Sequence, residues 1–133
     1  MRDYIIDASA AVEYLLRTPL GIVVAQTIED ASLAAPELLD VEVVSVLRRA
    51  VLRNQLEEDR ATQALNDLAT WPLERLSHTR LISTAWSLRH NTSAYDAFYV
   101  AAARLYGIPL LTADGPLSRA PGTGILIQNI RNA

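Results

Sequence analysis

The sequence predicts an α/β protein, a three-layer α/β/α sandwich with a central, mostly parallel sheet, formed by one domain over residues 1–133. Short apolar runs that suit buried strands alternate with helical patterns through the whole chain, and right-handed crossovers turn such an order into a parallel sheet. The 133 residues are 50% hydrophobic and 20% charged. This composition is typical of one packed domain and excludes a disordered chain.

Five short apolar runs are expected to form the strands. The first is Tyr-Ile-Ile at residues 4–6, which ends at Asp7 and suits a buried parallel strand. In the third run, residues 73–76, the preceding Pro72 and the charges of Glu74 and Arg75 act against strand formation. The remaining strands are expected at residues 33–35, 73–76, 109–112 and 124–128.

Apolar residues at helical spacing predict six helices between these strands. The first begins at Ser9 and is stopped by Thr18-Pro19, and the second opens at Gly21. The segment 37–54 has the strongest helical pattern, and a polar turn at 90–93 separates the last two helices. The remaining helices are expected at residues 21–31, 57–70, 79–89 and 95–106.

The composition excludes several chemistries. All 12 basic residues are arginine, cysteine is absent and there are two histidines. A Walker phosphate loop, a disulfide framework, a thiolate metal site and a cysteine nucleophile are therefore excluded, and a histidine-based zinc site is not expected. The net charge of −3 usually argues against a nucleic-acid partner.

The N-terminus and the apolar runs predict a cytoplasmic protein with no membrane partner. Residues 1–7 carry two acids and pass directly into a strand pattern, unlike a secretory signal. No apolar run approaches the roughly 18 residues that a membrane span requires.

Two of the three candidate aspartates lie where a parallel sheet binds ligands, and the third lies at the start of a helix. Asp7 and Asp114 follow predicted strands, and ligands bind outside the carboxyl ends of such strands. Asp96 lies in the first turn of its helix, three residues after Ser93, where the helix dipole favours negative charge. Helix capping is the alternative for each aspartate.

The helix over residues 37–54 offers two further acids. Glu42 falls on the apolar stripe, three residues after Leu39 and four before Val46, and is expected on the buried face. Asp40 lies about 200° away around the helix, also beside apolar residues, so periodicity favours Glu42 only modestly. A buried carboxylate needs a proton, a partner or a cation, and an arginine partner is the alternative to a functional role.

Four carboxylates cannot share one pocket without a cation. Because the candidate ligands are all oxygens, they select Mg²⁺ or Mn²⁺. Acid-only sites of this kind are typical of phosphodiester hydrolysis.

Four stretches of the chain resemble the signature motifs of the PIN-domain ribonucleases. They are Tyr-Ile-Ile-Asp-Ala-Ser-Ala at 4–10, Pro-Glu-Leu-Leu-Asp-Val-Glu at 36–42, Tyr-Asp-Ala-Phe-Tyr-Val-Ala at 95–101 and Leu-Leu-Thr-Ala-Asp at 110–114. In size and motifs the chain is similar, more narrowly, to the VapC toxins of VapBC toxin–antitoxin modules. The four stretches occur in the same order over essentially the whole chain.

The resemblance implies a PIN-like fold and a metal-dependent endoribonuclease, the toxin of a type II toxin–antitoxin module. It implies that Asp7, Glu42, Asp96 and Asp114 hold Mg²⁺ or Mn²⁺, and it favours Glu42 over Asp40. A metal-activated water would attack the RNA phosphodiester in line and leave 5′-phosphate and 3′-hydroxyl ends. The implied partners are RNA, a second copy of the chain, and a VapB-like antitoxin segment in a groove beside the acids.

The resemblance also assigns supporting residues near the acids. Hydroxyls of the family's metal site map onto Ser9 and Thr112. Gly115, Pro116 and Leu117 stand where some members carry a further acid, which puts a second metal in doubt.

Arginines and aromatic residues are candidates for RNA contact. Arg48, Arg49 and Arg53 cluster on the long helix, and Arg80 and Arg89 lie on a later one; a guanidinium suits phosphate oxygens. The alternative is a solvated helix face. Tyr95 and Tyr99 could stack on unpaired bases. Trp86 could do the same, although packing in the core is its favoured role.

Two alternatives from other families fit poorly, and one remains open. A receiver domain needs a lysine, and a haloacid-dehalogenase phosphatase needs an Asp where Ser9 stands. A non-catalytic PIN-fold module that binds RNA or protein is the main alternative, and cleavage of DNA flaps is a weaker one. Without the four site carboxylates, 11 acids remain against 12 arginines, so the net charge no longer argues against a phosphate-bearing substrate.

Overall fold

A computed structural model describes residues 2–132. Within them, five strands form one sheet in the order β3-β2-β1-β4-β5, and every neighbouring pair is parallel. The α/β class and the central sheet are therefore confirmed. The strands are β1 (Tyr4–Ile6), β2 (Leu33–Pro36), β3 (Glu74–Leu76), β4 (Leu110–Thr112) and β5 (Ile127–Asn129).

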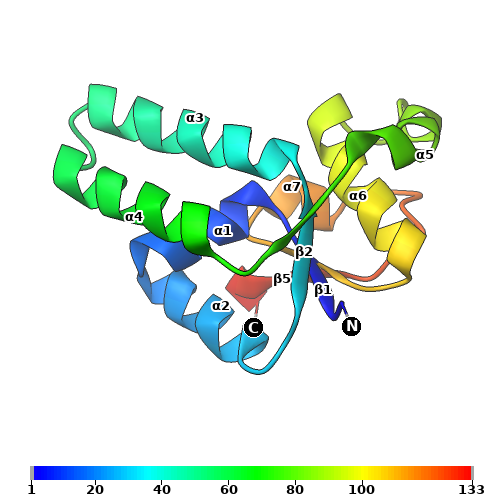
Figure 1. Cartoon of the computed structure of the whole chain (residues 1–133). Helices are drawn as coiled ribbons and strands as arrows, with labels where there is room; N and C mark the ends of the chain where they lie inside the picture. The colour runs from blue at the N-terminus through cyan, green and yellow to red at the C-terminus, as the bar shows by residue number, and fades with distance from the viewer. Residues whose placement is uncertain (1, 133) are drawn as a thin grey trace.

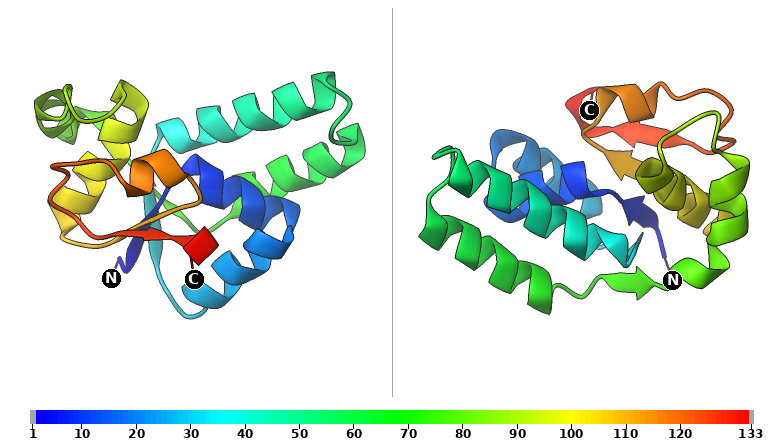
Figure 2. Two further views of the ribbon diagram at one scale, coloured as in Figure 1. Left: turned by 180° about the vertical axis from the view of Figure 1, so that it is seen from behind. Right: turned by 90° about the horizontal axis from the view of Figure 1, so that it is seen from above.

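Helices cover both faces of the sheet (Figures 1 and 2). Helices α1, α2 and α4 lie on one face, and α6 with α5 lies on the other, while α3 and α4 run side by side as a pair that extends away from the sheet (Figure 1). No single helix within residues 2–132 is long and apolar enough to cross a membrane, although α1 and α2, bent by 107°, pass that test when combined. The helices are α1 (Ala8–Leu16), α2 (Pro19–Ile28), α3 (Leu38–Leu52), α4 (Glu58–Thr70), α5 (Ile82–Ser87), α6 (Ala94–Tyr106) and α7 (Gly115–Ser118).

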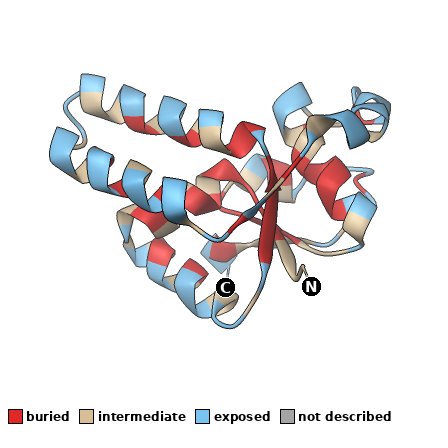
Figure 3. Cartoon of the chain, in the orientation of Figure 1, coloured by how far each residue is buried: buried red, intermediate tan, exposed pale blue. Residues whose placement is uncertain are grey.

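The core lies between these layers (Figure 3), and 13 of its 33 buried hydrophobic residues are alanine. Ile5, Ile6 and Leu110 of the central strands are fully buried. Small side chains let α6 approach the sheet closely, and its Ala102 and Ala103 are also fully buried. Because α6 packs on the sheet through this buried face, its first turn, which contains Asp96, is held at the edge of the sheet.

The predicted helices differ from the structure in two places. The segment 79–89 is divided into a 3₁₀ turn (His78–Arg80) and the short α5. Helix α7 is not among the predicted helices, because its 4 residues are too few to show a helical period. Pro116 lies in the first turn of α7, where its missing N–H costs nothing, and Asp114 caps the helix.

Helix α3 is held at its start by a residue from a distant part of the chain. Glu37 precedes α3 without capping it through its side chain. The Nε2 atom of His78 accepts the backbone N–H of Leu38 at 3.0 Å and so satisfies one of the donors that every helix start leaves free. The turn after β3 thus holds the helix that carries Glu42.

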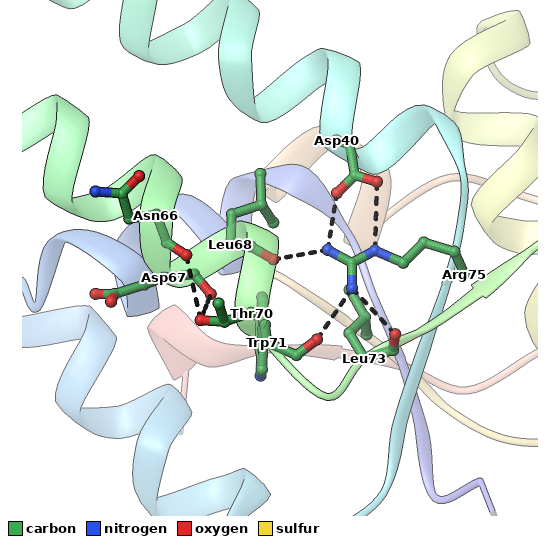
Figure 4. A network of polar contacts seen from close by, with 8 residues as sticks. All are labelled: Asp40, Asn66, Asp67, Leu68, Thr70, Trp71, Leu73 and Arg75. Atoms are coloured by element: carbon green, nitrogen blue, oxygen red, sulfur yellow. Dashed lines mark hydrogen bonds and ion pairs between the residues drawn. The ribbon is translucent and has the colours of Figure 1, made fainter.

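Arg75 ties α3, α4 and β3 together (Figure 4). Its guanidinium donates to Asp40 Oδ1 at 3.1 Å and Oδ2 at 3.3 Å. It also donates to the carbonyls of Leu68 at 2.8 Å, Trp71 at 3.0 Å and Leu73 at 3.2 Å. These carbonyls belong to the end of α4 and the chain that follows it, so Arg75 closes a helix terminus as well as forming an ion pair.

We expect Arg75→Met to lower the free energy of unfolding by about 2–3 kcal/mol, because it leaves carbonyls without their charged donor. Asp40→Asn should cost less than about 1 kcal/mol, because the Asp40 side chain is 40% exposed and water screens the pair. Urea denaturation of both variants measures the difference. Equal losses would show that the ion pair, rather than the carbonyls, carries the stabilisation.

Candidate active site

The sheet brings the predicted acids to one edge. From β1 the sheet extends to β2 and β3 on one side, and to β4 and β5 on the other. The order in which the chain adds strands therefore reverses between β1 and β4. Crevices at such a reversal are where open α/β sheets bind ligands. Asp7 directly follows β1, Asp114 follows β4 by two residues, Asp96 lies in the first turn of α6, and Glu42 lies in the helix after β2.

Asp7 is the buried member of the group, with 4% of its surface exposed. Its Oδ1 accepts the hydroxyl of Ser9 at 2.7 Å and the backbone N–H of Ala10 at 3.0 Å. Its Oδ2 accepts the hydroxyl of Thr112 at 2.5 Å. The predicted capping role is therefore real, since Asp7 caps α1, and both carboxylate oxygens are held in place.

The hydroxyls of Ser9 and Thr112 connect Asp7 to the loop after β4. Ser9 Oγ accepts the N–H of Ala113 at 2.9 Å, and Thr112 Oγ1 accepts the N–H of Asp114 at 2.9 Å. The two hydroxyl oxygens lie 3.2 Å apart. The two residues named for supporting hydroxyls thus contact Asp7, and they fix the backbone that carries Asp114.

Asp96 and Asp114 are partly exposed and both lie at helix starts. Ser93 Oγ caps α6 by accepting the N–H of Asp96 at 3.2 Å, as the capping pattern predicts. Asp114 Oδ1 caps α7 by accepting the N–H of Leu117 at 3.1 Å. The positive end of the α6 dipole favours negative charge at Asp96.

Glu42 and Asp40 have different partners. Glu42 is half-buried on α3 rather than on its fully buried face, and its Oε1 accepts the hydroxyl of Tyr99 at 2.6 Å. An arginine partner is the alternative to a functional role for Glu42. The structure shows such a partner at Asp40 instead, which pairs with Arg75. The structure therefore accounts for Asp40 as part of the fold and leaves Glu42 beside the other acids.

The charges of the four carboxylates are linked. Burial, with a smaller contribution from Asp96, raises the pKa of Asp7 to about 6, although three hydrogen bonds lower it. Burial also raises the pKa of Glu42 and of Asp96; Asp96 adds to the shift of Glu42, and Asp114 adds to that of Asp96. Asp96 thus lies at the centre of a group of mutually repelling acids.

These acids interact without forming a ready-made metal cage. Within residues 2–132, no three His, Cys, Asp or Glu side chains gather closely enough to hold an ion on their own. The donor set, carboxylate oxygens supported by hydroxyls, suits a hard divalent cation, and a buried carboxylate such as Asp7 favours one.

The three arginines named for RNA contact lie in the second half of α3 or directly after it, beyond Glu42. Arg48, Arg49 and Arg53 are exposed on α3, and Arg53 lies 11 residues beyond Glu42, about 16 Å along the helix. Arg119 was not singled out from the sequence. A Cβ added at Gly115, the residue after Asp114, would lie 2.9 Å from its Nη1, so the guanidinium lies next to the loop that carries Asp114.

Two predictions about aromatic residues are wrong. Trp86 is 67% exposed and not part of the core, because α5 is short and only its Ala85 is buried. Tyr99 is 1% exposed and cannot stack on a base. Its pKa is raised far above the usual value by burial and by Glu42. Its spacing of three residues from Asp96, which places both on one helix face, is the signal that could have revealed its contact with the acids.

Comparison with known sequences gives the family. The family model of the PIN domain matches residues 4–122. Ribonuclease VapC1 of Mycobacterium tuberculosis is 41% identical over 98% of this chain and 100% of its own length. Ribonuclease VapC12 of the same organism is 35% identical over 93% of this chain and 96% of its own length.

Solved structures agree on the fold. PAE2754 from Pyrobaculum aerophilum superposes with a TM-score of 0.72 at 19% identity, over 98% of this chain and 91% of that one. VapBC2 from Rickettsia felis, bound to a DNA fragment from its promoter, gives a TM-score of 0.65 at 14% identity, over 95% and 97% of the two chains. From the family model and the full-length relatives, this chain belongs to the PIN-domain family and, within it, to the VapC proteins.

Proposed function

We propose that this chain is a divalent-metal-dependent endoribonuclease and the toxin of a type II toxin–antitoxin module. The observation that carries the proposal is the group of Asp7, Glu42, Asp96 and Asp114 at the reversal of strand order, in a chain 41% identical to a protein named Ribonuclease VapC1 over nearly its full length. Neighbouring carboxylates with raised pKa values, here Asp7, Glu42 and Asp96, are typical of functional sites.

In this proposal Asp7, Asp96 and Asp114 hold Mg²⁺ or Mn²⁺, and Glu42 completes the ligand set or orients the attacking water. When bound, such a cation activates water and neutralises charge on the reacting phosphate. The protein's own groups prepare the site: Ser9 and Thr112 fix both oxygens of Asp7, and the starts of α6 and α7 place Asp96 and Asp114.

The proposed macromolecular partners are RNA, a second copy of this chain and an antitoxin. Exposed apolar side chains on α3 and α5 support protein partners. Ile82, Trp86 and Phe98 line a pocket of about 450 Å³ between α5 and the start of α6, the helix that carries Asp96. Val41 and Val44 are 71% and 47% exposed on α3. A toxin–antitoxin complex from Klebsiella pneumoniae is among the structures that share the fold.

We expect Asp7→Asn and Asp96→Asn to abolish RNA cleavage with the fold retained, because each removes a charge that the cation needs. Asp40→Asn is the matched control on α3 and should cleave normally, whereas Glu42→Gln should be impaired. Gel analysis of a synthetic RNA, with Mg²⁺, Mn²⁺ or EDTA and with DNA of the same sequence, measures this.

Full activity of either aspartate variant, or cleavage that persists in EDTA, would contradict the proposal. A wild-type protein that binds RNA without cutting it would be a non-catalytic PIN-fold module instead. Cutting of the DNA but not the RNA would indicate a deoxyribonuclease.

The raised pKa of Asp7 predicts a pH-dependent stability difference. In metal-free protein a folded-state pKa of about 6 against about 3.9 in the unfolded chain means that folding favours the protonated acid. The contribution of Asp7 to the free energy of unfolding is therefore fully present below pH 4 and is lost as the pH rises through 6. In EDTA, the free energy of unfolding of Asp7→Asn relative to that of wild type should rise by about 2–3 kcal/mol between pH 4 and pH 7.5.

Urea denaturation at pH 4, 5, 6 and 7.5 measures this gain, and millimolar Mn²⁺ at pH 7.5 should reverse it by stabilising wild type alone. A difference between the two proteins that does not change with pH would show that burial does not penalise the charge of Asp7.

A further inference from the structure

Tyr99 joins three elements at the acidic site. It lies on α6 with 1% of its surface exposed, and its hydroxyl donates to Glu42 Oε1 on α3 at 2.6 Å. The backbone N–H of Ala8, the residue after Asp7 and the first of α1, faces the same phenol oxygen. The hydroxyl therefore contacts the helix that carries Glu42 and lies close to the segment that carries Asp7.

Packing alone does not explain a tyrosine at this position. The other fully buried residues of α6 near it, Ala97, Val100 and Ala101, are apolar, and phenylalanine would fill the same space. A buried hydroxyl is costly unless it has a partner, and the partner here is a carboxylate of the proposed site. Asp96 lies three residues earlier, on the same face of the helix.

We propose that Tyr99 is a positioning residue of the acidic site, which holds Glu42 by Oε1 and leaves Oε2 available to a divalent cation and its ligands. This inference rests on the proposed function. Glutamate has three rotatable side-chain bonds, and Asp96 repels its charge, so the carboxylate needs an anchor. Partners of this kind, one step removed from the metal, typically account for 10- to 100-fold in metal affinity or activity.

The test compares Tyr99→Phe with Tyr106→Phe. The control removes the same atom from the same helix, at a residue whose ring, not its hydroxyl, faces Arg2. Isothermal titration with Mn²⁺ should give a Kd about tenfold higher for Tyr99→Phe and an unchanged Kd for the control. Equal affinity of Tyr99→Phe and wild type, with wild type binding Mn²⁺ and cleaving RNA, would overturn the role of Tyr99 and leave the proposed function intact.

A double-mutant cycle separates positioning from a general effect on structure. If Tyr99 acts through Glu42, the variant Tyr99→Phe/Glu42→Gln should bind Mn²⁺ as Glu42→Gln alone does. Additive losses would show that Tyr99 does not act through Glu42 and would overturn the inference. Wild type that neither binds Mn²⁺ nor cleaves RNA would overturn the proposed function, and this inference with it.

A measurement on the wild-type side chain covers the case in which Tyr99→Phe does not fold. With ¹³C-labelled tyrosine, the resonance of the Tyr99 carbon that bears the hydroxyl should shift on addition of Mg²⁺, with the midpoint of metal binding, and that of Tyr106 should not. Glu42→Gln should reduce the Tyr99 shift. A Tyr99 resonance that does not move as Mg²⁺ saturates the protein would overturn the inference.

Discussion

The buried carboxylate of Asp7 is the constraint on which the arrangement of the site depends. It directly follows β1, at the place between β1 and β4 where the strand order reverses, and 4% of its surface is exposed. A carboxylate can stay there only if its oxygens are satisfied, and three donors satisfy them from α1 and β4. Even so, burial raises its pKa to about 6, which is the electrostatic condition that favours a bound cation.

Other contacts place the remaining acids around Asp7. The hydroxyls that hold Asp7 also hold the backbone before α7 and so place Asp114. Helix α3 is fixed by three partners: His78 at its first N–H, Arg75 at Asp40 and Tyr99 at Glu42. Two acids two residues apart on one helix therefore have separate roles: Asp40 pairs with Arg75, which also closes the end of α4, and Glu42 belongs to the proposed active site.

Much of the fold and of the acidic group could be predicted from the sequence, because both depend on local patterns. Apolar runs located the strands and strand ends located Asp7 and Asp114, whereas periodicity alone separated Glu42 from Asp40 only modestly and the family motifs favoured it. The two failures have different causes. Trp86 is exposed because α5 is short and buries only Ala85, whereas the contact of Tyr99 with Glu42 joins residues 57 positions apart.

The central claim is that the carboxylates at the reversal of strand order bind a divalent cation. Crystals soaked in Mn²⁺ and measured at the manganese absorption edge test it most directly, since anomalous scattering locates the metal without reference to activity. The account predicts an anomalous peak bonded to Asp7 and to at least one of Asp96 and Asp114. An ordered acidic edge with no peak in saturating Mn²⁺, or a peak bound only elsewhere on the chain, would contradict it.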